Sequence, residues 1–374
     1  MKLFKNIFFI GLYSIFLFLC LVVTDQVYAR YEKFPFQNCL LILQRWKPFA
    51  FKTSDIPGLI YEMVPNVKKM GTNSMGIRDK EYQIPKPLNT FRILILGDSV
   101  AYGSQLEQEE VFSTLLRDKL NNHENNITYE VINAYVAGYN TMQEYIAFVN
   151  KCYIYKPDLV LVGFCHNDIT PAFVQEADQH GIIYSYLRHK KSENGQFFEN
   201  ITPYEMLSIS MPNIFHLPSF LHRRLMLSSS LYRGMMIRIY DSLTIKNPYK
   251  YPPGGYFNIV KDQTEYAIKN LKNYCRDYSI DLIFVLFPHL TDKYPIPEAR
   301  IYDFIGQAKK ILEGNSINYI DLRPYYQSRV DTLSKLRFSL RQDDTTHLNT
   351  LGHKLTAAAL YDYLVEYLKD KHKW

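Results

Sequence analysis

The chain has 374 residues, of which 47% are hydrophobic and 21% are charged, a balance typical of a globular protein with a sizeable core. This length allows one large domain with insertions, or two domains. The 43 basic and 37 acidic residues give a formal charge of only +6, and no block of Lys and Arg occurs, which argues against nucleic acid as a partner.

The first predicted element is an apolar run over residues 7–23 that follows two lysines. Basic residues ahead of a hydrophobic segment keep the N-terminus in the cytoplasm and send the following chain across the membrane. We therefore expect residues 1–29 to be a signal anchor, with a signal peptide cleaved before Arg30 and a buried core helix as the alternatives. The protein would then be membrane-anchored through this helix or secreted, with its main domain outside the cytoplasm.

Residues 30–90 form a second region, with aromatic and Pro-dotted sequence followed by a segment dense in Gly and Asn over 61–79. Such a composition indicates tight turns between short strands. We interpret this region as an N-terminal extension packed on the main domain.

From Phe91 onward, strand and helix patterns alternate. Buried parallel strands are short apolar runs, and strands that alternate with helices of this length indicate βαβ units with right-handed crossovers. The prediction is therefore an α/β fold with a parallel sheet covered on both faces, within a main domain of residues 91–374. The predicted strands are Arg92–Leu96, Tyr129–Ile132, Asp158–Gly163, Asp281–Leu286 and Asn318–Asp321, and the predicted helices are Glu109–Leu120, Met142–Tyr153, Asp262–Tyr278, Ala299–Leu312 and Thr350–Lys369.

Between the third and fourth predicted strands lie more than a hundred residues, far more than one crossover needs. We interpret residues 170–257 as an insertion over the carboxyl edge of the sheet, where lids and specificity loops lie. Its apolar helices are equally consistent with extra core or a membrane-facing surface.

The five cysteines contain no C-x-x-C pair and no His at zinc spacing, so a structural zinc site is not expected. One disulfide is allowed if the chain is exported. Cys165 is expected to be a small buried side chain rather than a reactive thiol.

The first strand stops at Gly97-Asp98-Ser99, and the carboxyl ends of parallel strands are where open α/β sheets place their chemistry. Ser99 is either a nucleophile or a helix cap. A nucleophilic serine needs a base, and the base needs an orienting carboxylate.

The segment before the last predicted helix offers both groups, in Asp344 and His347. Asp343 competes as the orienting carboxylate, and a helix-cap region with a surface histidine is the alternative interpretation. His353 is expected to face outward on the last helix or to pack at its start.

Acyl transfer also needs hydrogen-bond donors for the oxyanion of the transition state. Gly138 follows the second strand, and Asn167-Asp168 follows the third. Taken singly, Gly138 is equally a turn glycine, and Asn167-Asp168 is equally a helix cap.

Together these four blocks, in this order, resemble the SGNH (GDSL-type) hydrolase family over about residues 91–170 and 280–370, and the segment 73–79 resembles a block of its exported, membrane-anchored bacterial members. The resemblance implies a flavodoxin-like three-layer α/β/α fold with a five-stranded parallel sheet, and ester hydrolysis or acyl transfer without a metal or cofactor. Three positions depart from the family pattern: Val100, Tyr135 and Cys165.

The resemblance also implies the roles of single residues. Ser99 would be the nucleophile, His347 the general base and Asp344 its orienting carboxylate. The oxyanion hole would consist of the Ser99 N–H, the Gly138 N–H and the Asn167 side chain, with Asp98 and Asp168 as supporting residues.

The predicted function is therefore a serine-dependent ester hydrolase that acts through an acyl-enzyme on acyl groups of an extracytoplasmic glycan. The alternatives are an O-acyltransferase of the same fold, a non-catalytic module of an envelope or polysaccharide-assembly complex, and a lipid-directed lipase.

Overall fold

The protein divides into two compact units, one formed by Met1–Gln37 with Ile201–Phe257 and the other by Asn38–Asn200 with Asn258–Trp374. The computed structural model describes residues 2–31, 50–56, 58–59, 61–103, 106–122, 126–165, 168, 173–178, 181–192, 195–201, 205, 208, 211, 213–246, 256–288, 304–328 and 347–371.

The larger unit is built on a five-stranded sheet in the order β10-β9-β5-β3-β4, in which all neighbours run parallel. The chain turns to the opposite side of β3 after β4, so the sheet has a switch point beside β3. The predicted five-stranded parallel sheet is confirmed. Its strands are β3 (Thr90–Gly97), β4 (Thr128–Tyr135), β5 (Leu159–Phe164), β9 (Asp281–Leu286) and β10 (Asn318–Asp321).

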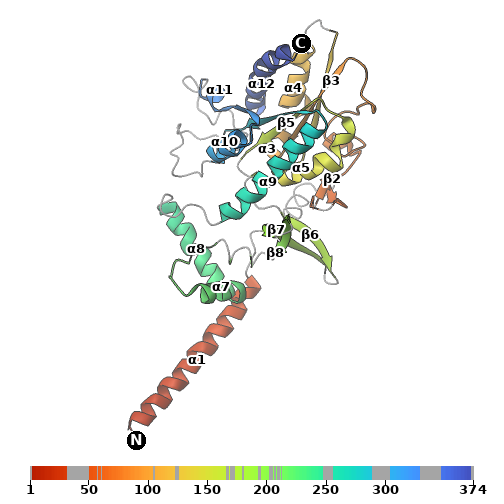
Figure 1. Ribbon diagram of the computed structural model, residues 1–374. Helices are drawn as coiled ribbons and strands as arrows, with labels where there is room; N and C mark the ends of the chain where they lie inside the picture. The colour runs from red at the N-terminus through yellow and green to blue at the C-terminus, as the bar shows by residue number, and fades with distance from the viewer. Residues whose placement is uncertain are drawn as a thin grey trace. The chain divides into compact units, whose positions relative to one another are not determined.

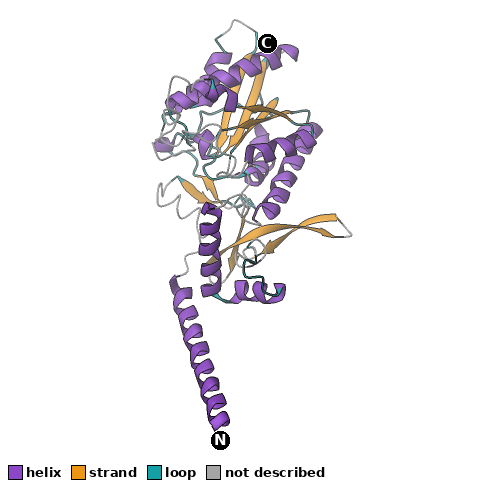
Figure 2. Ribbon diagram, turned by 90° about the vertical axis from the view of Figure 1, so that its left-hand side faces the viewer, coloured by secondary structure: helices purple, strands orange, loops and turns teal. Residues whose placement is uncertain are grey.

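Helices cover both faces of this sheet (Figure 1, Figure 2). On one face, α4 (Phe112–Leu120) and α12 (Thr350–Asp370) share a buried apolar cluster with alternate residues of the strands. On the other face, α5 (Thr141–Asn150) packs against α9 (Tyr256–Asp277). The α10 helix (Phe304–Gly314) connects β9 to β10, and the short α11 (Arg323–Gln327) precedes α12.

The predicted helices exist, but several ends differ. The helix predicted over Glu109–Leu120 is a 3-10 turn, η2 (Gln108–Glu110), followed by α4. The helix predicted over Met142–Tyr153 stops at Asn150 and is followed by η3 (Cys152–Tyr155), and α9 begins six residues before the predicted Asp262.

The described part of the extension contains a two-stranded antiparallel hairpin, β1 (Phe51–Thr53) and β2 (Tyr61–Met63), followed by η1 (Lys68–Met70). The Tyr61 hydroxyl donates to the Ala137 carbonyl at 2.7 Å, and the Gln143 side chain donates to the Leu59 carbonyl at 3.0 Å. The hairpin is therefore bonded to the turn between β4 and α5.

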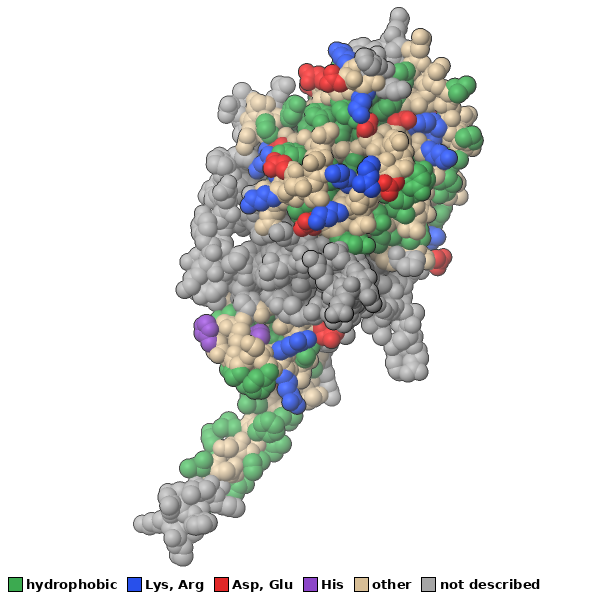
Figure 3. Space-filling model, viewed as in Figure 1, with side chains coloured by type: hydrophobic (Ala, Val, Ile, Leu, Met, Phe, Trp, Pro, Cys, Tyr) green, Lys and Arg blue, Asp and Glu red, His purple; other side chains and the backbone are tan. Residues whose placement is uncertain are grey.

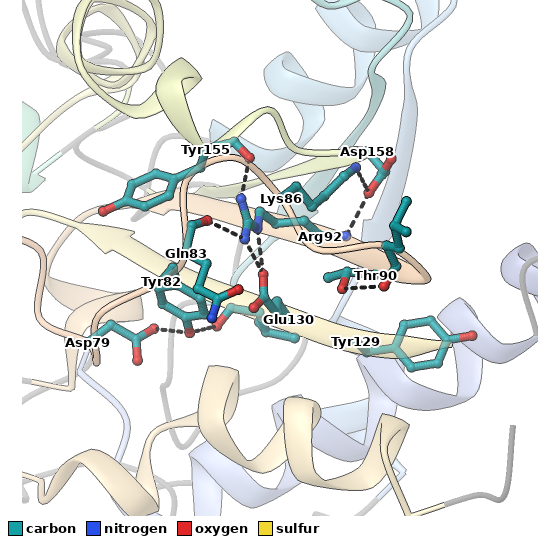
Figure 4. Close-up of polar contacts among 12 residues, drawn as sticks. Asp79, Tyr82, Gln83, Lys86, Thr90, Arg92, Tyr129, Glu130, Tyr155 and Asp158 are labelled. Carbon is teal, nitrogen blue, oxygen red and sulfur yellow. Dashed lines mark hydrogen bonds and ion pairs between the residues drawn. The ribbon is translucent and has the colours of Figure 1, made fainter. Parts of the chain in front are cut away.

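At the amino edge of the sheet, the fully buried Arg92 of β3 donates to three acceptors (Figure 4). Its Nε lies 2.6 Å from Glu130 Oε2, its Nη1 2.7 Å from the Tyr155 carbonyl and its Nη2 3.1 Å from the Gln83 carbonyl. A buried charge is tolerated when it is paired in this way.

The predicted insertion contains three strands that the sequence pattern did not indicate, β6 (Phe173–Asp178), β7 (Gly181–Ser192) and β8 (Gly195–Ile201). The apolar helices expected in the insertion are present as α7 (Ser219–Ser228) and α8 (Ser230–Lys246). The N-terminal helix α1 (Lys2–Tyr31) contains a span, Phe9–Ala29, that is long and apolar enough to cross a membrane, with a mean hydropathy of 1.9 and none of it buried. A signal sequence has the same properties.

Candidate active site

The centre of the candidate site is the turn between β3 and the short helix α3 (Ser99–Tyr102). The Asp98 carboxylate caps this helix by accepting a hydrogen bond from the Val100 N–H at 2.9 Å. Gly97 allows a close approach, because a Cβ at this position would lie 2.8 Å from the Ala101 Cβ. The strand therefore ends in a tight turn that places Ser99 at the carboxyl edge of the sheet.

The Ser99 hydroxyl lies 2.9 Å from Nε2 of His347, a residue 248 positions away in the sequence. The Asp98 carboxylate is a second and more distant partner of the hydroxyl, at 3.4 Å. With the imidazole proton on Nδ1, Nε2 accepts the serine proton. The structure thus brings together a hydroxyl and an adjacent base, the pair that activates a serine nucleophile.

The neighbouring histidine, His353, has a different environment. It is fully buried, its Nδ1 accepts a hydrogen bond from the Phe112 N–H at 3.2 Å, and burial lowers its pKa to about 3. The expectation that His353 faces outward is wrong, and the alternative, packing at the start of α12, is confirmed. A neutral histidine fixed in the core is a packing residue.

Gly138 lies at the same edge of the sheet as Ser99. The register pairs Gly97 of β3 with Tyr135 of β4, so Ser99 and Gly138 follow these partners by two and three residues. Gly138 has a φ of +81°, a backbone conformation that favours glycine, in the turn closed by the Tyr139 N–H donating to the Val136 carbonyl at 3.1 Å. The predicted residues Asp344 and Asn167, and the alternative Asp343, lie outside the described residues.

Asp168 connects three elements around the end of β5. One carboxylate oxygen accepts from the Cys165 N–H at 2.6 Å, and the other accepts from the Thr141 hydroxyl at 2.9 Å. The Asp168 carbonyl accepts from the Thr264 hydroxyl of α9 at 2.9 Å. Asp168 thereby joins the end of β5 to the start of α5 and to α9.

Cys165, one of the three positions that depart from the family pattern, contacts the turn after β3. Its Sγ is buried and lies 3.3 Å from Asp98 Oδ2, so the thiol donates to the carboxylate that caps α3. This contact links the ends of β3 and β5. The expectation of a small buried side chain is confirmed.

Glu144, in the first turn of α5, is 1% exposed, and its carboxyl oxygens have no hydrogen-bond partner within the described part of the chain. Burial, and then the nearby Asp168 and Asp98, raise the pKa of Glu144 well above its usual range. Burial and Asp98 also raise the pKa of Asp168, against the hydrogen bonds from Cys165 and Thr141. Sequence reasoning missed Glu144, because an acid in the first turn of a helix usually faces solvent.

Arg78, in the segment 73–79, binds the chain that follows α3, a contact that the sequence of this segment did not indicate. The Arg78 guanidinium donates to the carbonyls of Tyr102, Gly103 and Leu106 at 2.7, 3.1 and 2.5 Å. It therefore holds the chain that leaves α3. Its signal in the sequence was the block that resembles the exported family members.

Next to Arg78, Asp79 is buried and accepts hydrogen bonds from the Asn133 N–H of β4 at 3.1 Å and from the Tyr82 hydroxyl at 3.0 Å.

Among the residues that the structure describes, no group of three or more His, Cys, Asp and Glu side chains is arranged to hold a metal ion.

A model of the family described as "GDSL-like Lipase/Acylhydrolase" matches residues 93–360. No curated protein matches the chain. Similar solved structures include Axe2, an acetylxylan esterase from Geobacillus stearothermophilus, at 14% identity and a TM-score of 0.43, covering 73% of this chain and 93% of that one. The psychrotrophic esterase EstA from Pseudoalteromonas sp. is similar at 15% identity and a TM-score of 0.39, covering 74% of this chain and 98% of that one.

Proposed function

The chain belongs to the GDSL-like lipase/acylhydrolase family and is an ester-hydrolysing serine enzyme, and on this premise we propose that Ser99 is its nucleophile and His347 its general base. The observation that carries this assignment is the 2.9 Å contact between Ser99 Oγ and His347 Nε2. It is the geometry that a base needs in order to remove a proton from an attacking hydroxyl.

In the first half-reaction, Ser99 Oγ attacks the ester carbonyl carbon, and its proton passes to His347 Nε2. The backbone N–H groups of Ser99 and Gly138 and the Asn167 side chain stabilise the oxyanion, and Asp344 orients the imidazole. The protonated His347 then gives its proton to the leaving alcohol. In the second half, His347 takes a proton from water as the water attacks the acyl carbon, and it returns this proton to Ser99 Oγ as the bond to the acyl group breaks and the carboxylic acid leaves.

The proposed substrate is an acyl ester on a glycan outside the cytoplasm. The apolar span of α1 supports this part of the proposal, because a domain tethered to the outer side of a membrane meets surface glycans rather than metabolites. A sugar hydroxyl in place of water as the acceptor would make the protein an O-acyltransferase with the same nucleophile. The ratio of acyl transfer to acyl release, measured on an O-acetylated glycan with and without an acceptor sugar, distinguishes the two.

The test is turnover of p-nitrophenyl acetate by the full-length protein in detergent. We expect Ser99→Ala and His347→Ala each to lower kcat by about 10³-fold or more. Ser328→Ala, at an exposed serine after α11 whose hydroxyl bonds only its own turn at 2.9 Å among the described residues, is the matched control and should keep full activity. Unaltered turnover in Ser99→Ala overturns the assignment, and no turnover in the wild type favours a non-catalytic module.

A further inference from the structure

The helix α1 and the pair α7–α8 belong to the same compact unit. The span Phe9–Ala29 is uncharged up to Asp25, so residues 9–24, about 24 Å at 1.5 Å per residue, are the part that would lie in the hydrocarbon core of a bilayer, with Asp25 at its boundary. Its side chains are exposed, and Figure 3 shows hydrophobic side chains along its described part.

The carboxyl end of α1 is bonded to the start of α8. Asp25 Oδ1 accepts hydrogen bonds from the Ser229 hydroxyl and from the Leu231 N–H, both at 2.7 Å. A carboxylate at a helix N-terminus is favourable, because the unpaired N–H groups there carry partial positive charge. Asp25 thus fixes the junction of α7 and α8 at the end of the apolar span.

A second contact lies one turn further along both helices. Tyr28 of α1 packs against Gly234 of α8 so closely that any Cβ at this position would overlap the phenol ring. The Arg238 guanidinium lies 5.9 Å from the centroid of the same ring. These contacts hold the junction of α7 and α8 next to the carboxyl end of the apolar span of α1.

The outward face of α7 has no partner within the described residues. Phe220, Arg223, Arg224 and Leu227 follow the spacing of one helix face, and all four are exposed, with Phe220 75% and Leu227 38% accessible. His222 and Met226 point inward at 5% and 0%. In both ribbon views α7 runs crosswise to α1 (Figure 1, Figure 2).

The charge of α7 has one sign, because its sequence contains Arg223 and Arg224 and no Asp, Glu or Lys, whereas α8 carries Arg233, Arg238, Lys246 and Asp241. The two arginines of α8 have partners inside the unit: Arg233 is buried and donates to the carbonyls of Met226 and Leu227 at 2.9 and 3.0 Å, and Arg238 lies over the Tyr28 ring. The exposed charges of α7 are Arg223 and Arg224. Aromatic and aliphatic side chains beside arginines on one helix face are typical of helices that lie in a membrane interface.

We propose that α7 lies flat on the membrane from which α1 emerges, with Phe220 and Leu227 in the boundary between headgroups and acyl chains, and with Arg223 and Arg224 on anionic phospholipid phosphates. The occupant of this face is the lipid bilayer, because the Asp25 and Tyr28 contacts hold the face beside the end of the membrane span. This inference goes beyond the proposed function and does not depend on Ser99.

The test places a tryptophan in this face of the full-length protein, Phe220→Trp, in nanodiscs that contain brominated phosphatidylcholine and phosphatidylglycerol in equal parts. Leu88→Trp, at a residue of the other unit that is 95% exposed, is the matched control. We expect the bromine quenching added by Phe220→Trp to be at least about two-fold that added by Leu88→Trp.

Reversing both charges, Arg223→Glu with Arg224→Glu, should lower the quenching of Phe220→Trp in phosphatidylglycerol nanodiscs and have a smaller effect in phosphatidylcholine alone. Equal quenching of Phe220→Trp and Leu88→Trp overturns the proposal. The proposal is also overturned if brominated lipid does not quench the tryptophan of Phe220→Trp while a cross-linker joins this face of α7 to another protein. Aryl ester turnover, measured in parallel, should stay at the wild-type rate in all these variants, so this test and that of Ser99 fail separately.

Discussion

The two edges of the central sheet differ in whether their buried charged side chains have hydrogen-bond partners. At the amino edge, the fully buried Arg92 meets the Glu130 carboxylate and two backbone carbonyls (Figure 4). At the carboxyl edge, Glu144, Asp98 and Asp168 lie close together, and Glu144 has no hydrogen-bond partner among the described residues. A buried charge is tolerated when it is paired, and removing its partner is destabilising, whereas raised pKa values such as those of Glu144 and Asp168 are typical of functional sites. We infer that buried charge is fully paired at the amino edge and incompletely paired at the carboxyl edge, where the proposed nucleophile Ser99 lies.

Removing the buried Arg92 side chain at the amino edge should have the largest effect on stability. Arg92→Ala leaves Glu130 without its partner, so the free energy of unfolding should fall by about 3–5 kcal/mol, measured by urea denaturation. Arg276→Ala removes an exposed arginine paired with Asp277 and should cost under about 1 kcal/mol. Equal losses in the two variants would mean that the buried network does not stabilise the fold.

Replacing the buried carboxyl group of Glu144 by an amide should make the protein more stable than the wild type, and the difference should increase with pH. Because the pKa of Glu144 is raised in the folded state, the wild type loses stability above the unfolded value of 4.5, by up to about 1.4 kcal/mol per pH unit, until the folded pKa is reached. Glu144→Gln lacks this loss, so its advantage in unfolding free energy should grow as the pH is raised from about 5 through neutral pH. The exposed Glu109→Gln is the control. A constant difference between Glu144→Gln and the wild type across this range contradicts the assignment.

Substitution of Arg78 tests whether the N-terminal extension positions Ser99, the proposed nucleophile. Arg78→Ala removes the donors to the carbonyls after α3, so kcat should fall about ten-fold with KM nearly unchanged, since a small displacement of Ser99 is enough to slow the reaction. Arg78→Lys keeps the charge but cannot reproduce the fork, and should recover only part of kcat. A variant that loses thermal stability but keeps the wild-type kcat shows that Arg78 is structural only.

The smallest effect is expected at the solvent-exposed rim of the amino edge. Lys86 Nζ lies 2.6 Å from Asp158 Oδ2, with side chains 24% and 33% exposed. Lys86→Ala should therefore lower the free energy of unfolding by less than about 1 kcal/mol, and high salt should remove most of the difference. A loss as large as that of Arg92→Ala, unchanged by salt, would extend the stabilising network to the surface.

The sheet was predictable because its strands are continuous apolar runs that end in turn residues, as in Leu159–Phe164, where every residue is buried. Helix ends were less predictable. The helix α5 stops at Asn150 rather than Tyr153 because the chain tightens into η3, and no Gly or Pro marks that change.

The contact of Ser99 with His347 was predictable only from the order of the motifs, since 248 residues separate the two side chains and no local pattern connects them. Glu144 was not predictable, because its raised pKa depends on burial and on Asp168 and Asp98, which lie near it only in the folded protein. The roles predicted for Asp344 and Asn167 stay predictions.

The central claim is that His347 activates Ser99 at the carboxyl edge of the sheet. The direct measurement is mass spectrometry of the full-length protein after reaction with a fluorophosphonate, which modifies activated serines. The account predicts one adduct on the peptide that contains Ser99, none in Ser99→Ala, and labelling slowed by about 10²-fold or more in His347→Ala. Labelling of Ser99→Ala at the wild-type rate, or an adduct on another serine in the wild type, would contradict it.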